Sequence, residues 1–148
     1  MKRSEVRGFI RLGIEALSNA YAFNSGRVSE FNSNRSNTYP FLWLESLSTS
    51  TSINASTTNP FESWNVVIHV ADLDKADSTP VEYEAIVDAC DLIAQQLIRQ
   101  YNINLMYSDL TVIEGITREP FIHKHADNTT GVILAFTLTD YNSTNLCV

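Results

Sequence analysis

The residues with the clearest potential for chemistry are two histidines, His123 and His125, with Asp127 shortly after them. Alternate residues of an extended segment project to the same side, so the two imidazoles could ligate one metal ion. A metal site needs three or four ligands, and this segment supplies too few on its own. The remaining ligands would come from residues distant in the sequence: His69, Asp72 or Asp74. We therefore interpret the segment as a solvated loop between two strands and keep a small metal-dependent enzyme using His123 and His125 as an alternative.

Other patterns that carry chemistry are incomplete in this sequence. Asp72, Asp74 and Asp77 resemble a calcium-binding loop, but the glycine at its sharp turn and its bidentate glutamate are missing. Cys90 falls on the apolar stripe of a predicted helix, where burial raises the pKa of a thiol and suppresses its reactivity. The sequence contains neither a Gly-x-Ser-x-Gly elbow nor a glycine-rich phosphate loop. We therefore expect no enzymatic activity, no catalytic residue and no cofactor.

Length and charge narrow the class of protein. The chain has 148 residues, with 17 acidic and 10 basic side chains and a formal net charge of −7. This length fits one domain, and we predict a single α+β domain over residues 1–148. The negative charge disfavours nucleic-acid recognition, because phosphate contacts are made mainly by lysine and arginine. Charged residues interrupt the N-terminal segment and no apolar run approaches roughly 18 residues, so we predict neither a signal peptide nor a membrane span.

The first helix is predicted at the N-terminus. It is expected to start after Ser4 as the N-cap and to run to about Tyr21, with apolar residues on one stripe. Gly13 lies among these apolar positions, where the lack of a side chain favours close approach of a neighbouring backbone.

The second helix has a stronger signature, over residues 79–101. Thr79 and Glu82 have the spacing of a capping box, and Pro80 occupies the first helical position, where no backbone donor is needed. Its apolar stripe comprises Tyr83, Ile86, Val87, Cys90, Ile93, Ala94, Leu97, Ile98 and Tyr101. This spacing predicts a helix that buries one face against a core.

Strand-like segments lie on both sides of the second helix. Before it, strands are predicted at residues 39–44 and 61–71. After it, strands are predicted at residues 103–107, 110–114, 116–122 and 132–139, with Gly115 and Pro120 as breaks. This order fits an α+β sandwich of two layers, with an antiparallel or mixed β-sheet and two amphipathic helices packed on one face.

A long segment rich in serine and threonine separates two of the strands. Residues 46–59 are predicted to form a loop, and loops of this length often become ordered against a partner. Together with the apolar segment before it, this loop suits contact between subunits. The predicted interface residues are Tyr39, Phe41, Trp43, Leu47 and Ile53. The alternative is that Phe41 and Trp43 complete the core of a single chain.

Most of the chain contributes to a resemblance. The matching features are the helix at 4–21, the Tyr39–Leu44 segment, the Trp64–Val70 strand with the helix after it, and the closing strand over residues 131–136. In this layout the chain resembles the tail terminator and head-to-tail connector (neck) proteins of long-tailed bacteriophages. The resemblance implies a virion protein, assembled in the host cytoplasm as a homo-oligomeric ring between capsid and tail. It also implies portal, connector or tail proteins as neighbours, and no chemistry.

The charge of the chain agrees with such a role. The resemblance implies a ring through which DNA passes without specific binding, and an acidic lumen repels phosphate and lets the duplex slide. Two rival hypotheses stay open beside it, the metal-dependent enzyme and a monomeric intracellular binding module.

Overall fold

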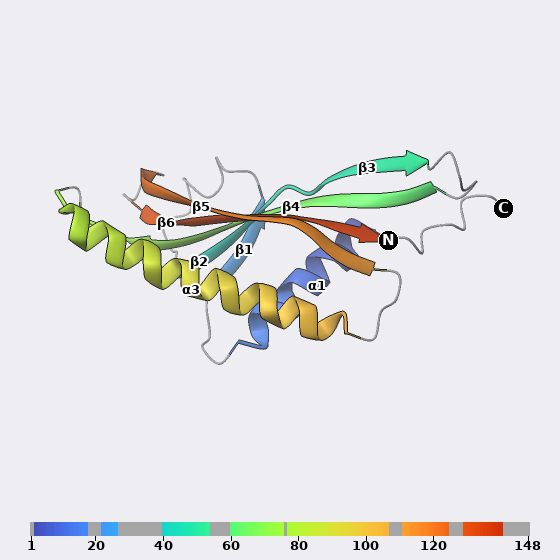
Figure 1. Cartoon of the computed structure of the whole chain (residues 1–148), viewed down its shortest axis with the longest axis horizontal. Helices are drawn as coiled ribbons and strands as arrows, with labels where there is room; N and C mark the ends of the chain where they lie inside the picture. Colours follow the sequence, from blue (N-terminus) through green and yellow to red (C-terminus); the bar gives the residue numbers. More distant parts are fainter. Residues whose placement is uncertain are drawn as a thin grey trace.

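Within the part of the chain that the structure describes, a mixed β-sheet of six strands forms one layer and two helices form the other (Figure 1). The computed structural model describes residues 2–17, 22–26, 40–53, 60–75, 77–106, 111–124 and 129–140. The helices are α1 (Arg3–Glu15) and α3 (Pro80–Asn104). The strands are β1 (Ala22–Gly26), β2 (Phe41–Glu45), β3 (Ser48–Ile53), β4 (Pro60–Leu73), β5 (Thr111–Lys124) and β6 (Thr129–Asp140). The predicted two-layer α+β class is confirmed.

β4 lies at the centre of the sheet. Five strands follow the order β1-β2-β4-β6-β5, and β3 pairs with β4 beside this path. β1 is parallel to β2, whereas all the other pairs are antiparallel. One side of β4 pairs with β6 along residues 62–73. Its other side pairs with β3 along residues 60–65 and with β2 along residues 68–71, so β4 connects every part of the sheet.

β2 and β3 act as one bulged strand along β4. Leu44 pairs with Ile68 and Ser48 pairs with Asn65, so three residues lie opposite two. One extra residue makes a β-bulge, which bends the strand and increases its twist. The loop predicted over 46–59 is therefore wrong for residues 48–53, while residues 54–59 lie outside the described part of the chain. Cross-strand pairing with β4 overrides the polar composition, because threonine fits a strand well and the ladder satisfies the backbone.

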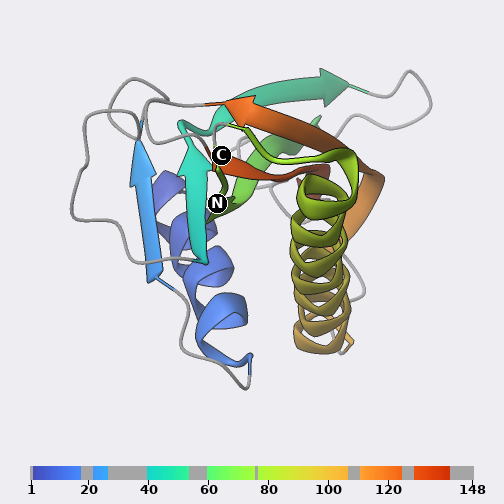
Figure 2. The same cartoon turned by 90° about the vertical axis from the view of Figure 1, so that its left-hand side faces the viewer.

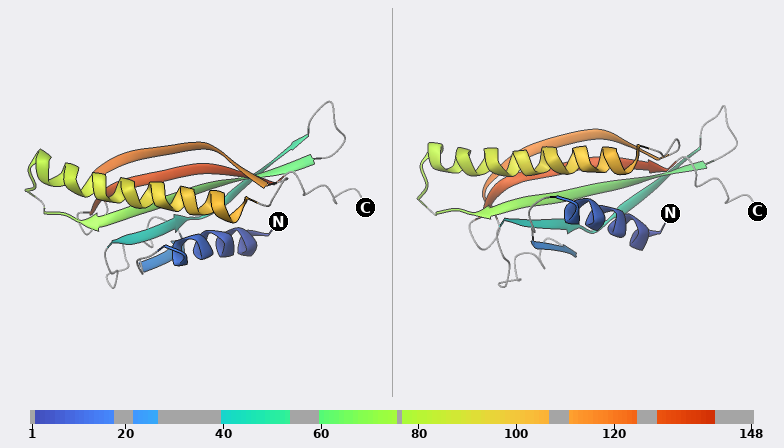
Figure 3. Two further views of the ribbon diagram at one scale, coloured as in Figure 1. Left: turned by 60° about the horizontal axis from the view of Figure 1, so that its bottom comes forward. Right: turned by 90° about the horizontal axis from the view of Figure 1, so that it is seen from below.

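Both helices cover the same face of the sheet, as Figures 2 and 3 show. Side chains from both layers form the main core. The helices contribute Val6, Ile10, Ile14, Cys90, Ile93, Ala94, Leu97 and Tyr101. The sheet contributes Leu42, Leu44, Trp64, Val66, Ile68, Val70, Val132, Leu134, Phe136 and Leu138. Every second residue of β2, β4 and β6 thus faces the helices, as the period of a strand requires.

The opposite face of the sheet carries a smaller apolar cluster. Its buried members are Phe41, Trp43, Ala71 and Phe121, and Ile133 packs against them. Phe41, Trp43, Ala71 and Ile133 are adjacent in sequence to members of the main core, so they point away from the helices. The sheet is therefore apolar on both faces near β2, but only one face is covered by α1 and α3.

The predicted start of the long helix is confirmed. Thr79 is the N-cap of α3, and its hydroxyl accepts a hydrogen bond of 3.4 Å from the backbone N–H of Glu82. Pro80 is the first helical residue, as expected from its missing donor. The helix continues to Asn104, three residues beyond the predicted end. Residues 103 and 104 are helical and residues 105 and 106 form a turn, so the strand predicted at 103–107 is wrong for residues 103–106. Residue 107 lies outside the described part.

Both boundaries of the first helix differ from the prediction. α1 begins at Arg3 with Lys2 as its N-cap, instead of starting after Ser4, and the Glu5 carboxylate accepts a hydrogen bond from the Lys2 backbone N–H. It ends at Glu15, well before residue 21. The N–H of Leu17 donates to the carbonyl of Ile14 at 3.2 Å, a tighter turn than that of an α-helix. This turn closes the helix although the apolar stripe continues in the sequence.

Gly13 allows the two helices to touch. A Cβ atom at this position would lie 2.1 Å from the Tyr101 ring, so the close approach is made by a side chain and not by a backbone as predicted. The Tyr101 hydroxyl donates a buried hydrogen bond of 3.0 Å to the carbonyl oxygen of Ile10. The ring of Phe9 lies 5.0 Å from that of Tyr101. The Tyr101 side chain, seated over Gly13, therefore contributes to holding α1 and α3 together.

The last part of the sheet has fewer breaks than predicted. Residues 111–124 form one strand, β5, instead of separate strands at 110–114 and 116–122. Gly115 adopts a φ of 63° at a shift in register between Glu114 and Thr117, so it makes a bulge and not an end. Pro120 is tolerated because β5 is an edge strand. The strands predicted at 61–71 and 132–139 are confirmed as β4 and β6, and β1 is a strand that the sequence did not predict.

Candidate functional site

The residues proposed as metal ligands do not form a described cluster. His123 lies in β5, but its side chain is outside the described part of the structure, as are His125 and Asp127. The His69 side chain is buried in β4, and its Nε2 lies 2.7 Å from Oε1 of Glu45. Among the described residues, no group of three histidine, cysteine, aspartate or glutamate side chains could hold a metal ion. The metal-dependent alternative stays a prediction.

Asp74 has a structural role in the turn before α3. Its Oδ2 accepts hydrogen bonds from the Thr130 hydroxyl at 2.7 Å and from the Ser78 hydroxyl at 3.0 Å. The carboxylate thus connects the end of β4 to the start of β6 and to the residues that lead into the helix. Asp72 belongs to β4, where it pairs with Thr130, and its carboxylate accepts from the backbone N–H of Leu73 at 2.8 Å. The contacts of Asp74 support its interpretation as a turn-forming residue, whereas Asp72 is a strand residue and that interpretation is wrong for it.

Cys90 is buried on the sheet-facing side of α3, as predicted. Its Sγ lies 4.0 Å from the carbonyl oxygen of Thr130. Burial, assisted by the negative charge of Asp72, raises the pKa of the thiol from its ordinary value of 9.0 to about 12. A thiol in this environment is neutral at physiological pH and inert as a nucleophile.

The five predicted interface residues have different environments. Phe41 and Trp43 are only 4% and 2% exposed, and the indole N–H of Trp43 donates to the Gly26 carbonyl at 3.2 Å. Leu47 is half-buried against the main core. Tyr39 and the side chain of Ile53 lie outside the described part of the structure. Burial within one chain favours the alternative that Phe41 and Trp43 complete the interior, and the interface assignment stays a prediction.

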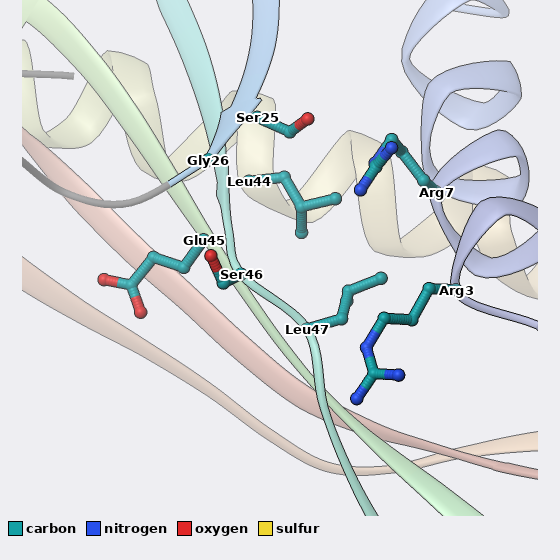
Figure 4. Close-up of a pocket in the computed structure, with 8 residues that line it drawn as sticks. All are labelled: Arg3, Arg7, Ser25, Gly26, Leu44, Glu45, Ser46 and Leu47. Atoms are coloured by element: carbon teal, nitrogen blue, oxygen red, sulfur yellow. The ribbon is translucent and has the colours of Figure 1, made fainter. Parts of the chain in front are cut away.

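A basic pocket lies at the N-terminal end of α1. Its volume is about 320 Å³. It is bounded by the first two turns of α1, the end of β1 and the junction between β2 and β3 (Figure 4). The residues that line it are Arg3, Arg7, Ser25, Gly26, Leu44, Glu45, Ser46 and Leu47. Three separate elements of the fold therefore meet around one concave surface.

The charge of the pocket comes from two arginines one helical turn apart. Figure 4 shows the side chains of Arg3 and Arg7 leaving α1 toward the strands, with the Ser25 hydroxyl turned toward Arg7. The guanidinium carbon of Arg3 also lies 5.5 Å from the centre of the Trp64 ring, which orients this side chain. Glu45 contributes its backbone side to the pocket, because its carboxylate points the other way and binds His69. The pocket is thus positively charged in an acidic protein.

This arrangement is suited to binding anionic groups. Guanidinium groups bind carboxylates and phosphates through paired hydrogen bonds, and the nearby N-terminus of α1 adds a partial positive charge. The lining residues include no cysteine or histidine, and the serines have no base against them among the described residues. The chemistry that fits the pocket is recognition of one or two anionic groups.

Sequence reasoning missed this pocket, although a signal was present. The first eleven residues contain Lys2, Arg3, Arg7 and Arg11, four of the ten basic residues of the chain. Arg3 and Arg7 have the i, i+4 spacing that places side chains on one helical face. The bulge between β2 and β3, which forms the opposite wall, has no comparable signal.

No model of a known protein family matches the chain, and no curated protein matches it. None of the described helices is long and apolar enough to cross a lipid bilayer.

Proposed function

We propose that this chain is a non-catalytic structural subunit that associates with copies of itself into a ring, as in the tail terminator or neck of a long-tailed bacteriophage. In this role it joins capsid and tail and contacts neighbouring portal, connector or tail proteins, while DNA passes through the ring. The observation that carries the proposal is that β3 forms an unprotected edge of the described sheet.

β3 pairs on one side only, with β4, among the described strands. Its sequence, Ser-Thr-Ser-Thr-Ser-Ile, contains no proline and no charged residue, and its described side chains are exposed. Single-chain proteins usually protect such an edge, because its free N–H and C=O groups pair readily with another chain. A subunit that assembles can use the same groups for association.

β5, which ends the described strand order opposite β1, has the protection that β3 lacks. It carries Glu114, Arg118 and Glu119, its pairing is interrupted by bulges, and Pro120 removes one backbone donor. The contrast favours β3 over β5 as the edge that each copy offers to its neighbour. Contacts between different surfaces of identical chains close into rings when the rotation between copies permits.

Net charge also supports the proposal. The charge of −7 on each subunit sums over the ring. The negative ring repels the phosphates of DNA, so a duplex can pass without being held. This argument concerns the channel and not the contacts between subunits.

The test is the mass and shape of the purified protein. We expect light scattering after size exclusion to give several copies per particle, and electron microscopy to show closed rings. Thr49→Lys with Thr51→Lys places two charges on the β3 edge and should reduce the particle to a single chain. Gln96→Lys with Asn102→Lys adds the same charge on exposed positions of α3 and should leave the ring intact. A single chain at high concentration in the unaltered protein would overturn the proposal.

A further inference from the structure

The two helices of the described structure carry opposite charge on their outer surfaces. α1 and its N-cap contribute four basic and two acidic side chains, whereas the exposed side of α3 carries mainly carboxylates in its first half. These acidic residues are Glu82, Glu84, Asp88 and Asp91. The chain therefore has a basic surface and an acidic surface on separate helices of the same layer.

Two of the four carboxylates of α3 already have cationic partners. Glu82 lies 3.7 Å from the Lys75 ammonium, and Asp91 lies 3.2 Å from the Arg118 guanidinium. Glu84 and Asp88 are exposed, and neither takes part in an ion pair within the described part of the chain. At i, i+4 spacing they face the same direction and repel each other by a few tenths of a kcal/mol. They form an uncompensated pair of anions.

Arg3 and Arg7 are the corresponding pair of cations. They too stand at i, i+4 spacing and are exposed, and they too form no ion pair within the described residues. The spacing of the two guanidinium groups along α1 equals the spacing of the two carboxylates along α3. Two helices laid side by side could therefore form two ion pairs at once.

The two surfaces do not meet within one chain. α1 contacts α3 where Gly13 faces Tyr101, and Glu84 precedes Tyr101 by about 25 Å of helix. The pocket is at the opposite end of α1 from Gly13, beside β1 and β2. A second copy of the chain can bring its own Glu84 and Asp88 to the pocket.

We propose that the basic pocket of one copy holds Glu84 and Asp88 from α3 of a second copy, an inference that rests on the self-association proposed above. The carboxylates accept hydrogen bonds from the two guanidinium groups, and the Ser25 hydroxyl supplies a further donor beside Arg7. The contact joins different surfaces of identical chains, so it repeats in one direction around an assembly. The β3 edge supplies backbone pairing between copies, and the ion pairs at the pocket fix the orientation of the two copies.

The test reverses each charge pair separately and then together. Arg3→Glu with Arg7→Glu should weaken self-association at least 10-fold, and so should Glu84→Lys with Asp88→Lys. An equimolar mixture of the two variants should restore assembly, because each retains one intact surface and the reversed surfaces complement each other. The control Arg11→Glu with Arg99→Glu changes the net charge by the same amount as Arg3→Glu with Arg7→Glu. It leaves the residues that line the pocket and the Glu84–Asp88 pair unchanged, and it should assemble normally. Thermal unfolding of each variant verifies that it is folded.

The outcomes separate this contact from the proposed function. If the unaltered protein forms rings and both reversed variants form them equally well, the contact is wrong and the ring proposal stands. If the unaltered protein is always a single chain, both proposals fail. A single chain that binds inorganic phosphate, with binding lost in Arg3→Glu with Arg7→Glu, would assign the pocket to a free anion and overturn the second copy as its occupant.

Discussion

β4 passes through two different environments, and the contrast between them separates stability from association. Along residues 68–71 it lies between β2 and β6 and faces the helices, and the Ile68 and Val70 side chains are 0% exposed. Along residues 60–65 it pairs with β3 on one side and, from residue 62, with the end of β6 on the other, in a ribbon that reaches beyond the ends of both helices (Figure 1). We call the first region the body and the second, with β3, the ribbon.

The two regions are held by different forces. The body is stabilised by burial of apolar side chains from three strands and two helices. The ribbon depends on backbone hydrogen bonds and on exposed polar contacts, such as the 3.2 Å bond from the Asn65 amide to the Ser48 hydroxyl. Trp64 is buried and fastens the ribbon to the core on the helix side. Substitutions should therefore affect folding in the body and association in the ribbon.

The largest effect is expected from a truncation in the centre of the body. Leu134 is fully buried in β6, and Leu134→Ala should lower the free energy of unfolding by about 3 kcal/mol, through lost burial and the cavity left behind. Thr49→Ala in the ribbon should change it by less than about 0.5 kcal/mol. Urea denaturation followed by circular dichroism measures both. Equal losses for the two variants would break the distinction between body and ribbon.

A smaller effect is expected where the two helices meet. Gly13→Ala places a methyl group against the Tyr101 ring and should cost about 1–3 kcal/mol. Gly8→Ala in the same helix meets nothing within 4 Å and should instead raise the free energy of unfolding by up to about 1 kcal/mol, because alanine favours the helix. Thermal unfolding of the two variants shows directly whether each substitution raises or lowers stability. A gain in stability from Gly13→Ala would show that α1 is not seated on that ring.

The smallest effect concerns pH. The thiol of Cys90 has a pKa of about 12 in the folded chain and an ordinary value of 9.0, so the unfolded chain loses its proton first as pH rises. The associated stability is complete below about pH 9 and decreases by about 1.4 kcal/mol per pH unit above it.

Urea denaturation at about pH 8 and about pH 10 should show this decrease, and Cys90→Ala should reduce it. Tyr101, whose pKa burial raises well above 10.0, adds to the decrease at higher pH, so the window ends at about pH 10. An identical pH dependence in the protein and in Cys90→Ala would place the thiol outside the core.

The regular spacing of apolar residues in the sequence predicted the body well. The start of α3, the alternation in β4 and β6 and the burial of Cys90 follow from local residue patterns, because in these elements the buried face is set by spacing alone. The prediction failed where the sequence is polar or where long-range pairing decides. β3 is a strand because β4 lies beside it, and β5 is continuous because an edge strand tolerates Gly115 and Pro120.

The basic pocket was also beyond prediction where it depends on pairing between distant residues. The spacing of Arg3 and Arg7 is visible in the sequence, and so is the excess of basic residues near the N-terminus. The wall that makes the surface concave comes from the bulge between β2 and β3 and from β1, whose pairing depends on distant residues. The sequence therefore contains a signal for the two arginines, which sequence reasoning missed, and the tertiary fold supplies the rest of the pocket.

The position of β6 between β4 and β5 sets an order of events during folding. Until β6 is in place, β4 and β5 each leave one edge unpaired, because they are not hydrogen-bonded to each other. Pairing between distant segments is slow to form, and unpaired strands of this kind are prone to aggregate. We expect a folding intermediate in which β6 is still unpaired to need shielding by a chaperone.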